Sequence, residues 1–148
     1  MNAERLPGGA GLGVSVRYVP ANGERMIATV YLYDRGQFRQ PEGGDSPDVL
    51  QELRAAAAEL NAVARMGRYR SVAFDTGMDV GPIRCANFRI VQQDGATTGD
   101  SVCVTIQHGR FVKVRLTSWS PPDSTAAGIA AAGLTSTVLD ARTRGTGS

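Results

Sequence analysis

The sequence has very few of the residues on which most metal and nucleophilic sites depend. Its 148 residues include a single histidine, His108, and two cysteines, Cys85 and Cys103. One histidine cannot form a histidine metal site, and two cysteines provide neither a metal-binding spacing nor a framework of several disulfides. The glycine-rich stretch 9–13 lacks the preceding strand and the following helix that a phosphate-binding loop requires. We therefore expect no metal and no cofactor.

Net charge and long apolar runs are also scarce. The formal net charge is only +2, and so small an excess argues against nucleic acid or an anionic membrane as the partner. No apolar run approaches the roughly 20 residues of a membrane-spanning helix. The first residues lack the apolar core of a signal peptide. Taken alone, the sequence therefore fits either a cytoplasmic protein or a trimmed, exported one.

What the sequence does contain is a series of alternating apolar and polar stretches and two helical patterns. The length suits one domain with a buried core, which we place at residues 1–148 with flexible ends at 1–10 and 143–148. The alternation predicts strands over 12–18, 26–34, 69–76 and 83–93, followed by two more within 100–120. The order β-β-α-β-β-β-β-α indicates the α+β class, with helices packed on a mostly antiparallel twisted sheet.

The first helix has clear start and stop signals. Ser46 is a suitable N-cap, Pro47 suits the first helical position, and Gly67 suits the C-terminal cap. A second, Ala-rich helix is predicted from Asp123 or Ser124 to about Arg142. Two glycines in it, at positions 128 and 133, weaken it by roughly 1 kcal/mol each relative to alanine. We therefore expect this helix to depend on packing.

The segment 100–120 is the clearest strand pair. Its apolar residues recur at every second position: Val102, Val104 and Ile106, then Val112, Val114 and Leu116. A two-residue turn at 108–109 would place valines of one strand beside charged residues of the other. A three-residue loop over 107–109 instead pairs Val104 with Val112 and puts Gly109 where a positive φ is needed. Because this register gathers the apolar residues on one face, we predict it.

The opposite face of that hairpin is the candidate binding face. The predicted register places Lys113 across from Cys103, and pairing Phe88 with Val104 would place Arg89 on the other side. A thiol between two cations is favoured as a thiolate, whereas a half-buried thiol without them is inert, and both interpretations stay open. The same alignment sets Cys85 about four residues from Cys103, too far for a disulfide. The complete candidate face comprises Arg89, Cys103, Phe111, Lys113, Arg115 and Trp119.

Other interpretations of this face and its surroundings are possible. A basic and aromatic stripe of this kind can bind anionic ligands or single-stranded nucleic acid, although cationic side chains also cover apolar surface with their stems. If the second helix covers the face, Phe111 and Trp119 become core residues. His108 has no nucleophile near it in the sequence, and Asp75 and Asp79 read as loop residues rather than as a catalytic carboxylate pair.

One resemblance accompanies these patterns. The stretches GLGVSVRY, ATVYLYDRG, MGRY and GRFVKVRLT, in this order, resemble a group of small exported bacterial proteins of unknown function whose fold is like that of PsbP, the extrinsic photosystem II subunit. The resemblance covers about residues 11–120 and implies a periplasmic or secreted protein. It implies no catalytic residues, and members of the wider fold mostly bind other proteins.

Two functions of different class follow as expectations. The first is a non-enzymatic protein-binding or assembly module of the bacterial cell envelope, with another protein as the partner. The alternative is a small thiol-dependent enzyme or anionic-ligand-binding domain that uses the outer face of the hairpin. The lack of a catalytic motif and the resemblance both favour the binding module.

Overall fold

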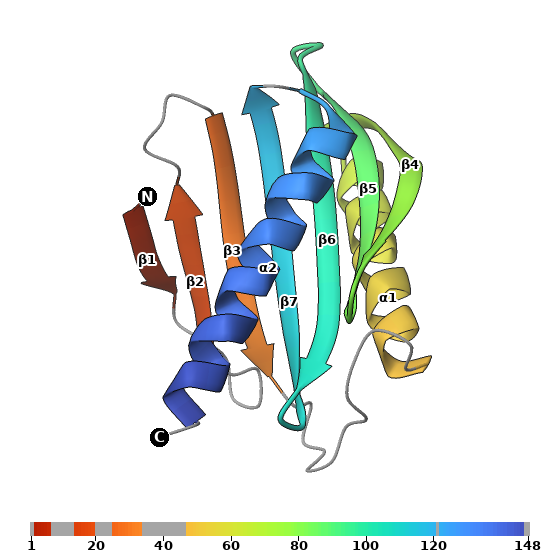
Figure 1. Ribbon diagram of the computed structural model, residues 1–148. Helices are drawn as coiled ribbons and strands as arrows, with labels where there is room; N and C mark the ends of the chain where they lie inside the picture. The colour runs from red at the N-terminus through yellow and green to blue at the C-terminus, as the bar shows by residue number, and fades with distance from the viewer. Residues whose placement is uncertain (1, 7–13, 20–24, 34–46, 121, 147–148) are drawn as a thin grey trace.

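The fold is built on one antiparallel sheet with a helix on each face (Figure 1). The computed structural model describes residues 2–6, 14–19, 25–33, 47–120 and 122–146. Its elements are β1 (Asn2–Leu6), β2 (Val14–Val19), β3 (Arg25–Tyr33), α1 (Pro47–Arg65), β4 (Tyr69–Val80), β5 (Ile83–Gln92), β6 (Thr97–Gln107), β7 (Arg110–Ser120) and α2 (Ser124–Thr146). This arrangement confirms the predicted α+β class and the mostly antiparallel sheet.

Both predicted helices and the six predicted strands have counterparts in the structure, which differs from the prediction in one additional strand and in the extent of two elements. Strand β1 lies in the segment expected to be flexible, and α2 continues to Thr146 rather than ending near Arg142. Strand β4 continues to Val80, beyond its predicted end at residue 76, and only Gly81 and Pro82 separate it from β5. Helix α1 is followed by Gly67 with a φ of 87°, as expected for the C-terminal cap. The predicted N-cap, Ser46, lies outside the described residues. Neither helix combines the length and hydropathy that crossing a membrane would require.

The strand order shows how the two halves of the chain meet. The sheet runs β1-β2-β3-β7-β6-β5-β4, and every neighbouring pair of these strands is antiparallel. Strands β4 to β7 follow one another as hairpins, whereas β3 pairs with β7 across the length of the intervening chain. The pairing of β3 with β7 therefore joins the first three strands and the last four into one sheet.

The hairpin β6–β7 has the register that the sequence analysis rejected. Its turn contains only His108 and Gly109, both at positive φ (53° and 77°), and Val104 pairs with Lys113. Positive φ at both central residues is the type I′ conformation, whose twist matches that of the flanking strands. The predicted pairing of Val104 with Val112 is therefore wrong. Val112 lies opposite Thr105 instead.

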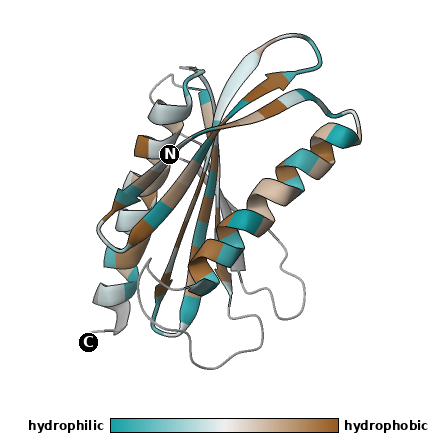
Figure 2. Ribbon diagram, turned by 90° about the vertical axis from the view of Figure 1, so that its right-hand side faces the viewer, coloured by the Kyte–Doolittle hydropathy of each residue, from teal (hydrophilic) through white to brown (hydrophobic). Residues whose placement is uncertain are grey.

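The reason for the error is that both faces of the sheet are covered. Figure 2 shows the two helices on opposite sides of the strands. The even-numbered apolar residues of β6 face α1 and those of β7 face α2, so these two sets of residues lie in different cores. The α1 core contains Val49, Leu53, Leu60, Phe88, Ile90, Val102, Val104, Ile106 and Phe111. The α2 core contains Met26, Ala28, Val30, Ile83, Cys85, Cys103, Val114, Leu116, Ala127 and Ala131.

A disulfide joins Cys85 of β5 to Cys103 of β6 inside the α2 core. The two residues lie directly opposite each other, with Cα atoms 4.0 Å apart. The prediction that they lie too far apart for a disulfide is therefore wrong. It rested on pairing Phe88 with Val104, whereas Phe88 lies opposite Asp100.

Helix α2 lies close to the sheet at Gly128, above Asn87. A Cβ atom at position 128 would lie 2.6 Å from both the Oδ1 and the Nδ2 atoms of Asn87. This amide is buried and held in place, because it accepts a hydrogen bond from the Ser101 hydroxyl (2.7 Å) and donates one to the Thr76 hydroxyl (3.2 Å). The glycine that weakens the isolated helix is thus the residue that lets the helix approach the sheet.

We expect opposite effects from alanine at the two glycines of α2. Gly128→Ala should lower the free energy of unfolding by about 1–3 kcal/mol, because the added methyl group overpacks against Asn87. Gly133→Ala is the matched control, since no atom lies within 4 Å of the position its Cβ would take. That variant should raise the free energy of unfolding by about 1 kcal/mol through helix propensity. Urea unfolding measures both, and equal effects would contradict the close approach.

Candidate functional site

The residues of the predicted binding face divide between the two faces of the sheet. Phe111, Lys113 and Arg115 share the α1 side of β7, whereas Cys103 points into the α2 core. Arg89 lies opposite Gly99 rather than opposite Cys103, and its side chain is exposed. Trp119, half-buried, lies where the pairing of β7 with β3 shifts by one residue. The six residues therefore do not form one surface.

The interpretation of Cys103 as a thiolate between two cations is wrong. The residue is fully buried, bonded to Cys85, and opposite Val114 rather than Lys113. A sulfur in a disulfide has no thiol proton to lose and cannot form a thiolate. In the oxidised protein, Cys103 therefore cannot serve as the nucleophile of a thiol-dependent activity.

Lys113 and Phe111 of β7 already make contacts within the fold. The Lys113 ammonium lies over the rings of Tyr31 and Tyr33, 4.8 and 5.8 Å from their centroids, and such contacts stabilise a cation. The ring of Phe111 stacks on that of Tyr33, with centroids 5.2 Å apart. The hollow beside Lys113 and Arg115 has a volume of about 30 Å³, which is room for a water molecule but not for a larger ligand.

Arg115 faces the most deeply buried carboxylate of the described residues, that of Asp100. One Arg115 Nη atom lies 4.0 Å from Asp100 Oδ2, and the hydroxyls of Thr117 and Thr98 donate hydrogen bonds to the two carboxylate oxygens at 2.7 and 3.2 Å. Burial raises the pKa of Asp100 above its usual value, and the hydrogen bonds and the arginine only partly offset this desolvation. Both carboxylate oxygens of Asp100 therefore have hydrogen-bond partners, which is typical of a structural network.

Asp100 predicts how stability depends on pH. Because its pKa is raised in the folded state, its contribution should be fully present below the pKa of the unfolded chain and lost as the pH rises through the folded pKa. Asp100→Asn keeps the shape and cannot ionise, so it should gain stability relative to the wild type as the pH rises. Urea unfolding of both proteins between about pH 3 and pH 8 measures this difference. A difference that is constant over the range, or that runs the other way, would contradict the raised pKa.

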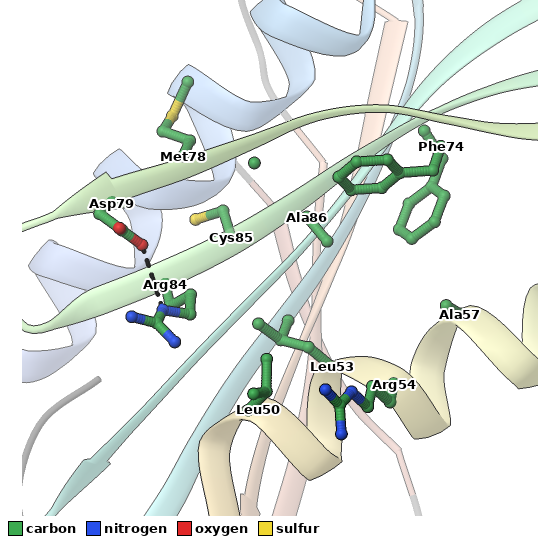
Figure 3. Close-up of a pocket in the computed structure, with 12 residues that line it drawn as sticks. Leu50, Leu53, Arg54, Ala57, Phe74, Met78, Asp79, Arg84, Cys85 and Ala86 are labelled. Atoms are coloured by element: carbon green, nitrogen blue, oxygen red, sulfur yellow. Dashed lines mark hydrogen bonds and ion pairs between the residues drawn. The ribbon is translucent and has the colours of Figure 1, made fainter. Parts of the chain in front are cut away.

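A larger cavity among the described residues lies elsewhere, between α1 and the β4–β5 hairpin. It is a pocket of about 430 Å³, within the range of small-molecule and side-chain binding pockets. Figure 3 shows Leu50 and Leu53 rising from α1 toward the hairpin, with Phe74 at one end. Its lining residues are Leu50, Leu53, Arg54 and Ala57 of α1, Phe74, Gly77, Met78 and Asp79 of β4, and Arg84, Cys85, Ala86 and Phe88 of β5.

The pocket has a buried apolar floor and a partly exposed rim. Leu53 and Phe88 are 7% and 2% exposed, whereas Leu50 and Phe74 are 36% and 63% exposed. The rings of Phe74 and Phe88 meet edge to face, with centroids 5.8 Å apart, a geometry that favours aromatic pairs. Phe74 is thus anchored on one side while most of its surface remains open to solvent.

Three charged side chains surround this apolar surface. Arg84 Nε donates a hydrogen bond to Asp79 Oδ1 over 3.3 Å, and the pair joins β5 to β4 at the pocket (Figure 3). Arg54 is exposed on α1 and has no ion pair or hydrogen bond with any described residue. The charged groups are therefore one ion pair and one separate guanidinium.

Asp75 and Asp79, which were expected to be loop residues, both lie in β4 and bind different partners. Asp75 accepts a hydrogen bond from the Ser124 hydroxyl at the start of α2 (2.7 Å), whereas Asp79 is bound to Arg84. His108 occupies the exposed turn between β6 and β7, as expected. The sequence patterns did not predict the pocket, because they do not show how α1 lies against β4 and β5.

The described residues contain no group of three or more His, Cys, Asp or Glu side chains that could hold a metal ion. The pocket offers apolar surface, two guanidinium groups and one paired carboxylate, which suits binding better than proton transfer. No protein-family model, curated protein or solved structure matches the chain.

Proposed function

We propose that this chain is a non-enzymatic binding module of the bacterial cell envelope and that its partner is another protein. The observation that carries the proposal is the apolar pocket between α1 and the β4–β5 hairpin. Its volume of about 430 Å³ accommodates one or two large side chains of a partner.

The exposed apolar residues support this choice of surface. The described residues include five large apolar side chains with substantial exposure: Leu50, Met66, Phe74, Val80 and Ile129. Two of them, Leu50 and Phe74, line the pocket, and Val80 follows Asp79 of its lining. Exposed apolar surface bordered by charged residues is typical of protein interaction sites, in which aromatic residues and arginine supply much of the binding energy.

The disulfide supports the cellular location. Disulfide bonds form and persist in oxidising compartments such as the periplasm and are rare in the reducing cytosol. The Cys85–Cys103 bond is thus compatible with an extracytoplasmic protein, and the resemblance to small exported bacterial proteins with a PsbP-like fold agrees with it.

The test compares two equally exposed apolar residues on different surfaces. Phe74 at the pocket and Ile129 on α2 are both 63% exposed. We expect Phe74→Ser to weaken binding to the partner at least about tenfold, as for an interface residue that contributes more than about 1.4 kcal/mol, and Ile129→Ser to leave it unchanged.

The wild-type protein and both variants are used as bait against a cell-envelope fraction. Any protein retained by the wild type is then purified and its Kd measured by calorimetry, after the melting temperatures confirm that both variants are folded. A partner that binds Phe74→Ser as tightly as the wild type would contradict the proposed surface.

A further inference from the structure

We propose that the pocket between α1 and the β4–β5 hairpin selects a partner segment in which an apolar side chain is adjacent to an aspartate or glutamate. In this proposal Arg54 is the residue that binds the carboxylate. This inference rests on the proposed function and specifies the partner's chemistry. Its first support is that Arg54 contributes to the lining of the pocket, whose other charged side chains, Arg84 and Asp79, already form an ion pair with each other.

The surroundings of Arg54 leave its charge uncompensated among the described residues. Its neighbours one turn away on α1, at positions 50, 51, 57 and 58, are Leu, Gln, Ala and Ala. None of them carries a carboxylate, so the helix does not supply the ion pair that arginines on helix surfaces commonly make. Arg84, the other arginine that lines the pocket, already has a partner, because it binds Asp79 across the hairpin.

The charge balance of the pocket follows from these contacts. Among the described residues that line the pocket, two guanidinium groups and one carboxylate give a net charge of +1 beside the apolar floor. An occupant that fills the floor with an apolar side chain and places one carboxylate near Arg54 satisfies both features. A neutral occupant leaves the guanidinium without a partner, and a cationic one is repelled.

The contribution of each feature to binding differs. The apolar side chain supplies the affinity, because it removes the surfaces of Leu50, Leu53 and Phe74 from water. The carboxylate supplies selectivity, since a charge pair at an exposed rim contributes modestly and weakens with salt. Arg54 is therefore a specificity-determining residue rather than the main source of affinity.

The experiment uses three synthetic peptides of the same length with a central leucine flanked on both sides by aspartate, asparagine or lysine. Each is titrated into the full, isotope-labelled chain, and the amide signals of the pocket-lining residues report binding. We expect the aspartate peptide to bind about fivefold more tightly than the asparagine peptide at low salt, and the lysine peptide to bind most weakly. The preference should shrink as salt is added.

Two arginine variants locate the selectivity. Arg54→Gln should bring the aspartate and asparagine peptides to equal affinity. Arg65→Gln is the matched control, because Arg65 is an exposed arginine at the other end of α1 and does not line the pocket; it should keep the fivefold preference. If Arg54→Gln keeps the preference as well, the assignment of Arg54 is overturned.

The remaining outcomes separate this inference from the proposed function. Equal binding of the aspartate and asparagine peptides to the wild-type pocket overturns the carboxylate preference and leaves the pocket as a docking surface. If none of the peptides shifts the pocket signals, both the inference and the proposed surface are overturned. Sodium decanoate is the probe for a lipid-like occupant, and its binding to the pocket more than about a hundredfold tighter than the aspartate peptide would overturn the protein segment as the ligand.

Discussion

Val114→Asp should abolish the folded state. Val114 is fully buried in the α2 core, where it lies opposite Val30 on one neighbouring strand and Cys103 on the other. An aspartate there would be surrounded by apolar groups, and burying an unpaired charge costs more than the 5–15 kcal/mol or so that a typical domain has available. We expect the variant to show no cooperative thermal transition.

Two further variants on the same strand make this expectation specific. Arg110→Asp introduces the same carboxylate at an exposed position of β7 and should melt close to the wild type. Val114→Thr keeps the shape of the side chain and buries a hydroxyl, which should cost about 1–3 kcal/mol. A wild-type melting temperature for Val114→Asp would contradict the assignment of the α2 core.

Removing the disulfide should produce the second large effect. Replacing Cys85 and Cys103 together by alanine opens a loop with a sequence separation of 18 residues. Loop-closure entropy gives such a crosslink a contribution on the order of 3 kcal/mol, because the crosslink restricts the unfolded chain. We expect the double variant to lose about this much free energy of unfolding in urea, without loss of the fold.

A reductant provides the control for this measurement. The wild type unfolded in the presence of dithiothreitol should approach the stability of the double variant, and the double variant itself should not respond to the reductant. Two free thiols in the unfolded wild-type protein without reductant would show that the bond is absent and would contradict the expectation.

Both helices and six strands were predicted because they depend on local patterns, whereas β1 lies in a segment that was expected to be flexible. The alternation of Val112, Val114 and Leu116 indicates a strand whichever way they point, and the proline and glycine that border α1 act within one turn of the helix. Alternation separates the two faces of a strand, but it does not say which face of the neighbouring strand each one joins. That choice needs the positions of both helices.

The error in the register of β6–β7 shows this limit. Requiring one apolar face is reasonable for a sheet covered on one side, but here Val104 faces α1, whereas Val112 lies on the same side of β7 as Val114 and Leu116 of the α2 core. Once the register is shifted by one residue, Cys103 moves from the charged face to the α2 core. The predicted thiolate is a consequence of that shift, whereas the missed disulfide follows from the separate error in the pairing of β5 with β6.

The disulfide did leave a signal in the sequence, in the turn between β5 and β6. The Gln92 amide bonds to the Ala96 carbonyl across a short loop in which Gly95 has a φ of 89°. Counting outward from this turn brings Cys85 opposite Cys103. The Asp94-Gly95 dipeptide is a strong hairpin signal, whereas our prediction placed a longer loop there. The pocket left no comparable signal, since it depends on how α1 lies against two strands.

The position of β6 at the boundary of both cores has a consequence for how the sequence can vary. Every residue from Thr98 to Ile106 is buried, with one set of side chains under α1 and the other under α2. In most proteins neutral substitutions accumulate at surface positions, and this stretch of β6 has no surface positions. Lineages that diverge from this chain should therefore change β6 least, and a change there should be accompanied by compensating changes in whichever helix it faces. The long edge strand β4 is exposed over most of its length, so neutral substitutions can accumulate there at the positions that do not line the pocket.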